Sequence, residues 1–268
     1  MNSEEQHAII EKRDHVLIVR LNRPAKRNAL SPDMLMKVYD AWRELDDNTD
    51  LRCAIITGTN DVFCAGADLT AMYSGDQGSQ EIIKRMESVP DLHWQALLRH
   101  NRPYKPIIAA VEGFALAGGT EFLHGTDIRV AAETATFGLT EAKRGLFPLG
   151  GATVRIRRQI PYTLAAEMLL TGRRVNAQEA KEFGLIGHVV PKGQAFDKAL
   201  ELAEEIVENS PVAIKAIMKS LRDLGEGMPE EEALEKELEL GWPVFKSEDS
   251  KEGLAAFAEK RKPNFTGK

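Results

Sequence analysis

The sequence predicts an α/β fold over about the first 190 residues, followed by a helical region. Short apolar stretches of strand length recur at residues 16–19, 53–57 and 107–111. Segments with amphipathic helical spacing lie between them, and from residue 194 onward every segment has that spacing. We therefore expect a core over residues 1–193 and a helical oligomerisation region over residues 194–268.

Residues 7–21 alternate between apolar and polar side chains, which predicts two strands that turn near Arg13 and Asp14. A helix is expected to begin next, because Ser31 is a good N-cap and Pro32 fits a first helical turn. Apolar residues then recur at spacings of three and four, at Leu35, Val38, Trp42 and Leu45. This pattern predicts a helix with one buried face.

The rest of the chain continues this alternation. Strands are expected at residues 53–57, 107–111, 128–131, about 136–137 and 186–190, and helices at 162–170 and 177–183. Residues 69–102 contain Gly75 and Gly78, and they predict a mobile loop plus a helix that could cover a ligand. The C-terminal region should hold three or four helices, separated at residues 210–211, 225–227 and 242–243.

Composition excludes several classes of function. The 268 residues carry a net charge of −6, which argues against a general nucleic-acid or anionic-membrane binder. No apolar run approaches the ~18 residues of a membrane span, and the N-terminus lacks the order of a signal peptide. Two cysteines and six scattered histidines offer no metal-ligand spacing. We expect a protein of the reducing cytoplasm without a metal or redox cofactor.

Two turns rich in small residues follow predicted strands, at residues 63–69 and 113–121. Small residues at strand ends let a ligand approach the backbone, and two N–H groups aimed at one point form an oxyanion hole. Either turn alone is more typical of simple tight packing. Neither matches a phosphate-binding P-loop or a Gly-x-Gly-x-x-Gly dinucleotide motif.

Two glutamates lie close to these turns in sequence. Glu121 falls in the first turn of the helix expected to begin near residues 118–119, and Glu141 lies beside Lys143 and Arg144. Taken singly, Glu121 is typical of a residue that compensates a helix dipole, and Glu141 of a surface ion pair. A pair of carboxylates in one site could instead provide a general acid and a general base.

Several stretches together resemble the enoyl-CoA hydratase/isomerase (crotonase) family, in its order and spacing. These are residues 21–24 (Leu-Asn-Arg-Pro) with 28–30 (Asn-Ala-Leu), 63–69, 113–121, 171–173 (Thr-Gly-Arg), 177–190 and 256–261. The resemblance covers nearly the whole chain and implies the crotonase (ClpP-like) spiral of repeated ββα units. It also implies a homotrimer, or a hexamer built as a dimer of trimers.

The resemblance also implies an active site. The family's oxyanion hole corresponds to the backbone N–H groups of Ala67 and Gly118. Its hydratases carry two glutamates twenty residues apart, matched by Glu121 as the water-activating base and Glu141 as the proton donor. Its isomerases commonly keep only the second, so an enoyl-CoA hydratase of fatty-acid β-oxidation is the expected function. An isomerase, hydrolase or decarboxylase on the same oxyanion hole, or a non-catalytic RNA-binding member of the fold, is the alternative.

Coenzyme A would enter as part of the acyl-CoA substrate. The residues expected to bind it are Arg23, Ala25, Lys26, Arg27, Ala65, Asp68 and Leu69, with Phe257 and Lys260 from a neighbouring subunit. Two departures from the family pattern stand out. Asp61 and Thr70 replace basic residues, and the turn at residues 148–151 is one residue shorter, with Leu149 in place of a glycine. Residues 115–121 and 126–130 resemble members from steroid-degrading bacteria that accept bulky acyl chains.

Overall fold

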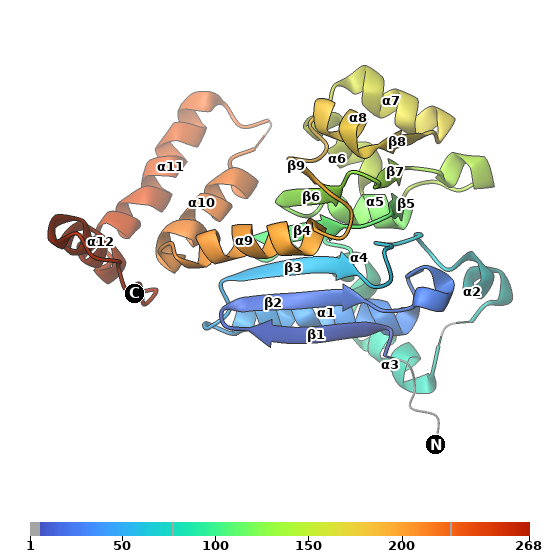
Figure 1. Cartoon of the computed structure of the whole chain (residues 1–268), viewed down its shortest axis with the longest axis horizontal. Helices are drawn as coiled ribbons and strands as arrows, with labels where there is room; N and C mark the ends of the chain where they lie inside the picture. Colours follow the sequence, from blue (N-terminus) through green and yellow to red (C-terminus); the bar gives the residue numbers. More distant parts are fainter. Residues whose placement is uncertain (1–5, 77, 226) are drawn as a thin grey trace.

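A computed structural model describes residues 6–76, 78–225 and 227–268. Its central layer is a six-stranded sheet in the order β1-β2-β3-β4-β6-β9 (Figure 1). The strands are β1 Ala8–Arg13, β2 Val16–Leu21, β3 Cys53–Gly58, β4 Ile107–Val111, β6 Ile128–Ala132 and β9 His188–Val190. Only β1 and β2 pair antiparallel; the other neighbours are parallel. The expected strands are confirmed, although β9 begins two residues later than predicted.

A second, three-stranded sheet has the order β5-β7-β8. Its strands are β5 Phe114–Leu116, β7 Thr136–Gly138 and β8 Arg174–Asn176. Successive units of the chain therefore place one strand in each sheet: β4 and β5 precede α5 (Gly118–Leu123), and β6 and β7 precede the 3-10 helix η2 (Glu141–Arg144). This repeated winding is the expected spiral, and it brings the ends of β3, β5 and β7 together.

Helices cover both faces of the large sheet. On one side lie α1 (Pro32–Asp47), α4 (Leu92–Ala96), α6 (Ala152–Gln159), α7 (Tyr162–Thr171) and α8 (Ala177–Glu182), which enclose the larger apolar core. On the other side α9 (Ala195–Val207) packs Ala195, Ala199 and Ala203 against Ile18 and Ile55. The helical region expected from residue 194 thus has two parts, because its first helix belongs to the sheet.

The segment at residues 69–102 holds three short helices rather than one. They are α2 (Leu69–Ser74), α3 (Gln80–Ser88) and α4, and they follow directly on the first glycine-containing turn. The 3-10 helix η1 (Pro24–Lys26) lies beside that turn. The predicted cap of α1 is confirmed, since the Ser31 hydroxyl accepts a hydrogen bond from the Met34 backbone N–H.

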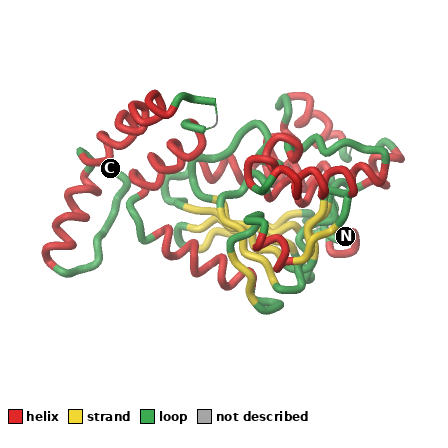
Figure 2. Tube along the Cα trace, turned by 90° about the horizontal axis from the view of Figure 1, so that it is seen from above, coloured by secondary structure: helices red, strands yellow, loops and turns green. Residues whose placement is uncertain are grey.

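The last three helices, α10 (Pro211–Asp223), α11 (Glu230–Phe245) and α12 (Glu248–Glu259), form an arm that extends away from the sheets (Figures 1 and 2). The predicted interruption at residues 242–243 is wrong, because α11 continues through Pro243 to Phe245. A proline removes one N–H and crowds one carbonyl. Here it costs the hydrogen bond to the Glu239 carbonyl, but only two helical residues follow it, so the helix ends within one turn. None of the described helices is long and apolar enough to cross a membrane.

Candidate active site

The turn at residues 63–69 is fixed by hydrogen bonds along both of its edges. On one edge the Cys64 N–H donates to Phe114 O (3.0 Å), and the Leu116 N–H donates to Cys64 O (2.9 Å). On the other edge the Leu30 N–H donates to Gly66 O (2.8 Å), and the Asp68 N–H donates to Leu30 O (3.3 Å). The turn is therefore a short strand-like segment held between two others.

This pairing orients the Ala67 N–H. In the parallel bridge between Leu30 and Ala67, the bonds involve Leu30 and the neighbours of Ala67. The N–H of Ala67 itself consequently faces away from Leu30. Gly118 is the first residue of α5, where backbone N–H groups have no intrahelical acceptor. A Cβ atom built on Gly118 would lie 3.6 Å from the Ala67 nitrogen, so the two backbones are in contact.

The backbone next to Gly118 is held in an unusual conformation. Ala117 has φ +50° and ψ −123°, a region that residues with a Cβ rarely adopt. Its N–H donates to Gly138 O (2.7 Å), and the hydroxyl of Thr120 donates to Ala115 O (2.6 Å). Gly66, at φ +94°, lies so close that a Cβ there would be 2.8 Å from the Ala117 Cβ. These contacts maintain the conformation in which the two turns meet.

Glu121 is on α5, one turn beyond Gly118, and only 5% of its surface is exposed. The Ala152 N–H donates to Glu121 Oε1 (3.3 Å), and the Gly150 backbone also faces the carboxylate. Burial, and next the charge of Glu141, raise the pKa of Glu121 to about 7, against the opposing effect of these N–H groups and of Arg99. Its carboxyl group can therefore take up or release a proton near neutral pH.

Glu141 is the first residue of η2 and is 8% exposed. Its two carboxyl oxygens are buried, and no other residue in the described part of the chain donates a hydrogen bond to them. Burial raises the pKa of Glu141, opposed only by its own backbone N–H. The surface ion pair that Lys143 and Arg144 suggest is thus absent, and the Glu141 carboxyl group binds a proton more tightly than an exposed glutamate does.

The short turn at residues 148–151 contacts Glu121. A Cβ on Gly150 would lie 2.9 Å from Cδ of Glu121, so any other residue there would displace the Glu121 side chain. The helix α6 begins immediately after this turn and supplies the Ala152 N–H. Sequence reasoning missed α6 and its contact with Glu121, because Gly151 provides no side-chain cap that would signal a helix start.

The residues expected to bind coenzyme A divide into three groups. Arg23 forms a salt bridge with Asp68 (3.0 Å) and also donates to Ala29 O (2.9 Å). Ala25, Lys26 and Arg27 are exposed on or beside η1, next to Ala65 and Leu69, and neither Lys26 nor Arg27 forms an ion pair within the described residues. Phe257 and Lys260 lie at the end of α12, on the arm (Figure 1). The structure therefore brings together all of these residues except Phe257 and Lys260.

The charged groups of Arg23 and Asp68 already have partners within the chain. The Asp68 carboxylate accepts from the N–H groups of Thr70 and Ala71, so it also caps α2. The Ala71 N–H is the main cause, ahead of Arg23, that lowers the pKa of Asp68. This pair braces the segment at residues 23–30 against the first turn. Its contact with coenzyme A stays a prediction.

Comparison with known proteins places the chain in a family. A family model described as enoyl-CoA hydratase/isomerase matches residues 11–268. The chain is 55% identical to the enoyl-CoA hydratase EchA19 of Mycobacterium tuberculosis over 96% of both chains. It is 36% identical to the 2,3-dehydroadipyl-CoA hydratase of Escherichia coli over 97% of this chain and 98% of that one.

Solved structures agree. A structure titled a putative enoyl-CoA hydratase/isomerase from Mycobacterium abscessus is 44% identical, with a TM-score of 0.88 over 98% of this chain and 100% of that one. An enoyl-CoA hydratase structure from M. tuberculosis is 38% identical, with a TM-score of 0.89 over the same shares. The two meeting turns, the buried carboxylate pair and these similarities together show that the chain belongs to the enoyl-CoA hydratase/isomerase family and has the crotonase fold.

Proposed function

We propose that the protein is an enoyl-CoA hydratase that adds water across the 2,3-double bond of a 2-enoyl-CoA thioester. The observation that carries this proposal is the pair of buried carboxylates, Glu121 and Glu141, beside the meeting point of the two turns. The product would be a 3-hydroxyacyl-CoA. The proposed reaction uses no metal or redox cofactor.

The backbone N–H groups of Ala67 and Gly118 would donate hydrogen bonds to the thioester oxygen, which lies between them. Negative charge develops on that oxygen as the double bond is attacked, and two fixed donors stabilise the resulting enolate. The strained Ala117 and the crowded Gly66 support this role, because they hold the donors before substrate arrives.

The two carboxyl groups would divide the proton transfers. Glu121 takes a proton from water, whose oxygen bonds to C3, while Glu141 gives a proton to C2. The hydrogen bond from Ala152 favours the charged form of Glu121, whereas Glu141 has no such donor from another residue. Their surroundings therefore suit a base and an acid respectively. An isomerase would need only one of them, which is why we favour the hydratase.

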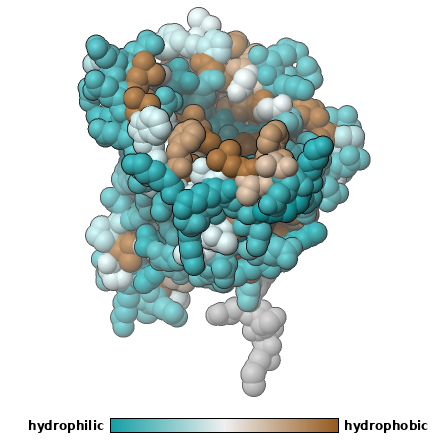
Figure 3. Space-filling view, turned by 90° about the vertical axis from the view of Figure 1, so that its left-hand side faces the viewer, coloured by the Kyte–Doolittle hydropathy of each residue, from teal (hydrophilic) through white to brown (hydrophobic). Residues whose placement is uncertain are grey.

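Oligomerisation would complete the site. The arm exposes large apolar side chains that the chain itself does not cover: Ile217, Leu221, Leu234, Leu238, Trp242, Phe245, Leu254 and Phe257. Apolar side chains also gather on the side of the molecule that the arm forms (Figure 3). We propose that these faces pack between subunits in a homotrimer or a dimer of trimers. Phe257 and Lys260 would then reach the coenzyme of a neighbouring subunit.

The acyl group would lie against exposed apolar residues beside the two turns. Met72 and Tyr73 on α2, and Phe147 and Leu149 in the short turn, are 60%, 95%, 62% and 55% exposed. We propose that these side chains pack on the acyl chain of the substrate. We also propose that the enzyme acts in fatty-acid β-oxidation in the cytoplasm. The buried free cysteines, Cys53 and Cys64, are compatible with a reducing compartment.

A panel of enoyl-CoA thioesters, from four carbons to fused-ring size, tests the reaction directly. Hydration removes the absorbance of the conjugated thioester, so each rate can be followed without coupling enzymes. Turnover of at least one member to its 3-hydroxyacyl-CoA is expected. If 3-enoyl-CoA substrates are isomerised while no 2-enoyl-CoA is hydrated, the proposal is wrong and the isomerase replaces it.

A further inference from the structure

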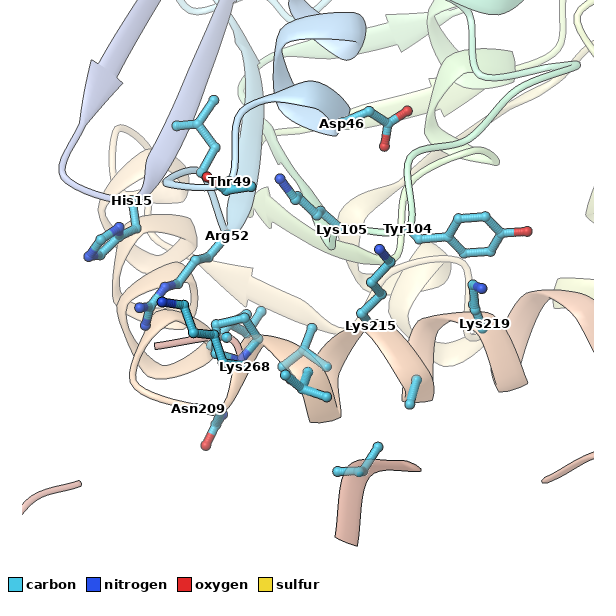
Figure 4. A pocket seen from close by; sticks show the side chains of 18 of the residues that line it. His15, Asp46, Thr49, Arg52, Tyr104, Lys105, Asn209, Lys215, Lys219 and Lys268 are labelled. Atoms are coloured by element: carbon cyan, nitrogen blue, oxygen red, sulfur yellow. The ribbon is translucent and has the colours of Figure 1, made fainter. Parts of the chain in front are cut away.

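A large cavity lies between the sheet-bearing core and the arm, apart from the site described above. Its volume is about 910 Å³, within the range of small-molecule sites. It is lined by the end of α1, residues 49–52 just before β3, residues 101–105, α10 and α11 (Figure 4). Ala67, Gly118, Glu121 and Glu141 are not among its lining residues.

The lining of the cavity is cationic, although the protein as a whole carries a net charge of −6. Seven basic side chains line it against three acidic ones. The basic residues are Arg43, Arg52, Arg102, Lys105, Lys215, Lys219 and Lys268, and the acidic residues are Asp46, Asp50 and Glu239. A local excess of this sign inside a concave surface attracts anions.

Some of these cations have partners and others do not. Arg102 pairs with Asp127 (3.1 Å), and Lys105 donates to the backbone oxygens of Leu45 and Asn48 (2.6 and 2.7 Å). In contrast, neither Lys215 nor Lys219 forms an ion pair with any described residue. Both rise from α10 into the cavity (Figure 4), and the Lys219 ammonium lies 5.6 Å from the centre of the Tyr104 ring.

Like charges also lie close together here. Burial lowers the pKa of Lys105, and the charge of Lys215 lowers it further. The two ammonium groups therefore lie in one environment. The charge of Asp46 opposes this lowering at Lys105, and burial raises the pKa of Asp46 itself. An anion between Lys105, Lys215 and Lys219 would relieve this repulsion.

Part of the cavity wall is apolar. Val212 on α10 and Leu240 and Val244 on α11 line the cavity. At about 100° per residue, Leu240 and Val244 project from a different side of α11 than the exposed Leu234 and Leu238. The cavity therefore lies within one chain, and the face of α11 proposed to pack between subunits leaves it in place.

We propose that this cavity binds an amphipathic organic anion, a carboxylate or sulfonate on an apolar body. The anionic group pairs with Lys215 and Lys219, and the apolar body packs on Val212, Leu240 and Val244. An inorganic anion would leave the apolar wall in water, and a neutral hydrocarbon would leave the ammonium groups unpaired. Only a ligand that has both parts satisfies both walls.

Titration of the full chain with 1-anilinonaphthalene-8-sulfonate tests the proposal, because its fluorescence rises on binding. The titration is run with saturating butanoyl-CoA, which fills the acyl-CoA site and has no double bond to hydrate. One probe molecule per chain is expected to bind, to be displaced by decanoate, and not to be displaced by inorganic phosphate. Combined Lys215→Gln and Lys219→Gln should weaken binding about tenfold or more, since two charge-assisted contacts are lost.

Matched variants separate charge from folding. Lys215→Arg with Lys219→Arg keeps both charges and should retain most of the affinity, and Lys181→Gln on the exposed face of α8 should change nothing. Hydration activity should be unchanged in all of them. If the double Gln variant does not fold, Val212→Phe repeats the test by narrowing the cavity. Probe binding that is seen only without butanoyl-CoA and is lost in its presence, or equal affinity in the Gln variants and the wild type, would overturn the proposal.

Discussion

Gly150 lies directly against the carboxyl group of Glu121. A Cβ added at Gly150 would be 2.9 Å from Cδ and 3.0 Å from Oε2 of that residue. The N–H of Ala152, two residues further on, holds the other carboxyl oxygen. The short turn and the start of α6 thus position Glu121 from across the fold.

Gly150→Ala should therefore displace the Glu121 carboxyl group without removing it. We expect kcat to fall by about tenfold or more, because misplacement of a catalytic group by an ångström is enough for such a loss. KM should change little, since the turn does not contact the two oxyanion N–H groups. Steady-state kinetics measure both. Gly187→Ala is the control, because its Cβ would meet only Arg129 O, at 3.9 Å.

The raised pKa of Glu121 should appear in the stability of the protein. Its carboxyl group has a pKa of about 7 in the folded chain against an ordinary value of 4.5, so the folded state holds the proton more tightly. Its contribution to stability is full below pH 4.5 and is lost as pH rises to 7. The free energy of unfolding of Glu121→Gln, relative to that of the wild type, should therefore rise by about 2 kcal/mol from pH 5 to pH 8. Chemical denaturation at the two pH values measures this difference.

The control for this measurement is Glu201→Gln, an exposed position on α9. It should shift stability equally at both pH values. If Glu121→Gln likewise shows the same difference from the wild type at pH 5 and at pH 8, the Glu121 carboxyl group is not perturbed by burial.

The titration of Glu121 should also limit activity. The rate of hydration is expected to fall as pH drops below about 7, because Glu121 becomes protonated.

Parts of the molecule that depend on local sequence were predictable. The β1–β2 hairpin and the Ser31 cap of α1 follow from alternation and capping, and both are confirmed. The three-residue strands β5 and β8 were missed, because so few residues carry no readable period. The continuation of α11 through Pro243 was also missed, because a proline beyond the first turn usually ends a helix.

The active site was predictable in its residues but not in its surroundings. Glu121 and Glu141 each fit an ordinary surface role, and only the resemblance to a family paired them. Their burial depends on contacts distant in sequence: Ala152 lies thirty-one residues from Glu121. Such contacts leave no local pattern in the chain.

Asp68 gives a test of the first turn. Asp68→Asn keeps a side-chain cap for α2 but loses the charge that pairs with Arg23, whereas Asp68→Ala loses both. The alanine variant should be less stable than the asparagine variant by about 1 kcal/mol, the usual value of a cap. Both should raise KM for enoyl-CoA, because the brace beside Ala67 is weakened. Urea denaturation and kinetics together check this; equal stability of the two variants would contradict the capping role.

The arm should control assembly. Leu238→Lys places a charge on the exposed apolar face of α11, and it is expected to dissociate the oligomer, because a buried unpaired charge is strongly unfavourable at an interface. Sedimentation velocity at micromolar concentration measures the state. Glu182→Lys on α8 adds a lysine to the exposed surface elsewhere and should leave assembly intact. A wild-type protein that is monomeric and fully active would contradict the shared site.

The two-carboxylate mechanism is tested most directly by hydration kinetics of Glu121→Gln, Glu141→Gln and the double variant. Each single change should leave KM nearly intact and lower kcat by about 10²–10⁴-fold, the usual contribution of a positioned acid or base. The double change should cost less than the product of the two single losses, because both groups act on one water. Near-wild-type hydration by the Glu121→Gln enzyme, with activity lost only through Glu141→Gln, would contradict the mechanism and indicate an isomerase.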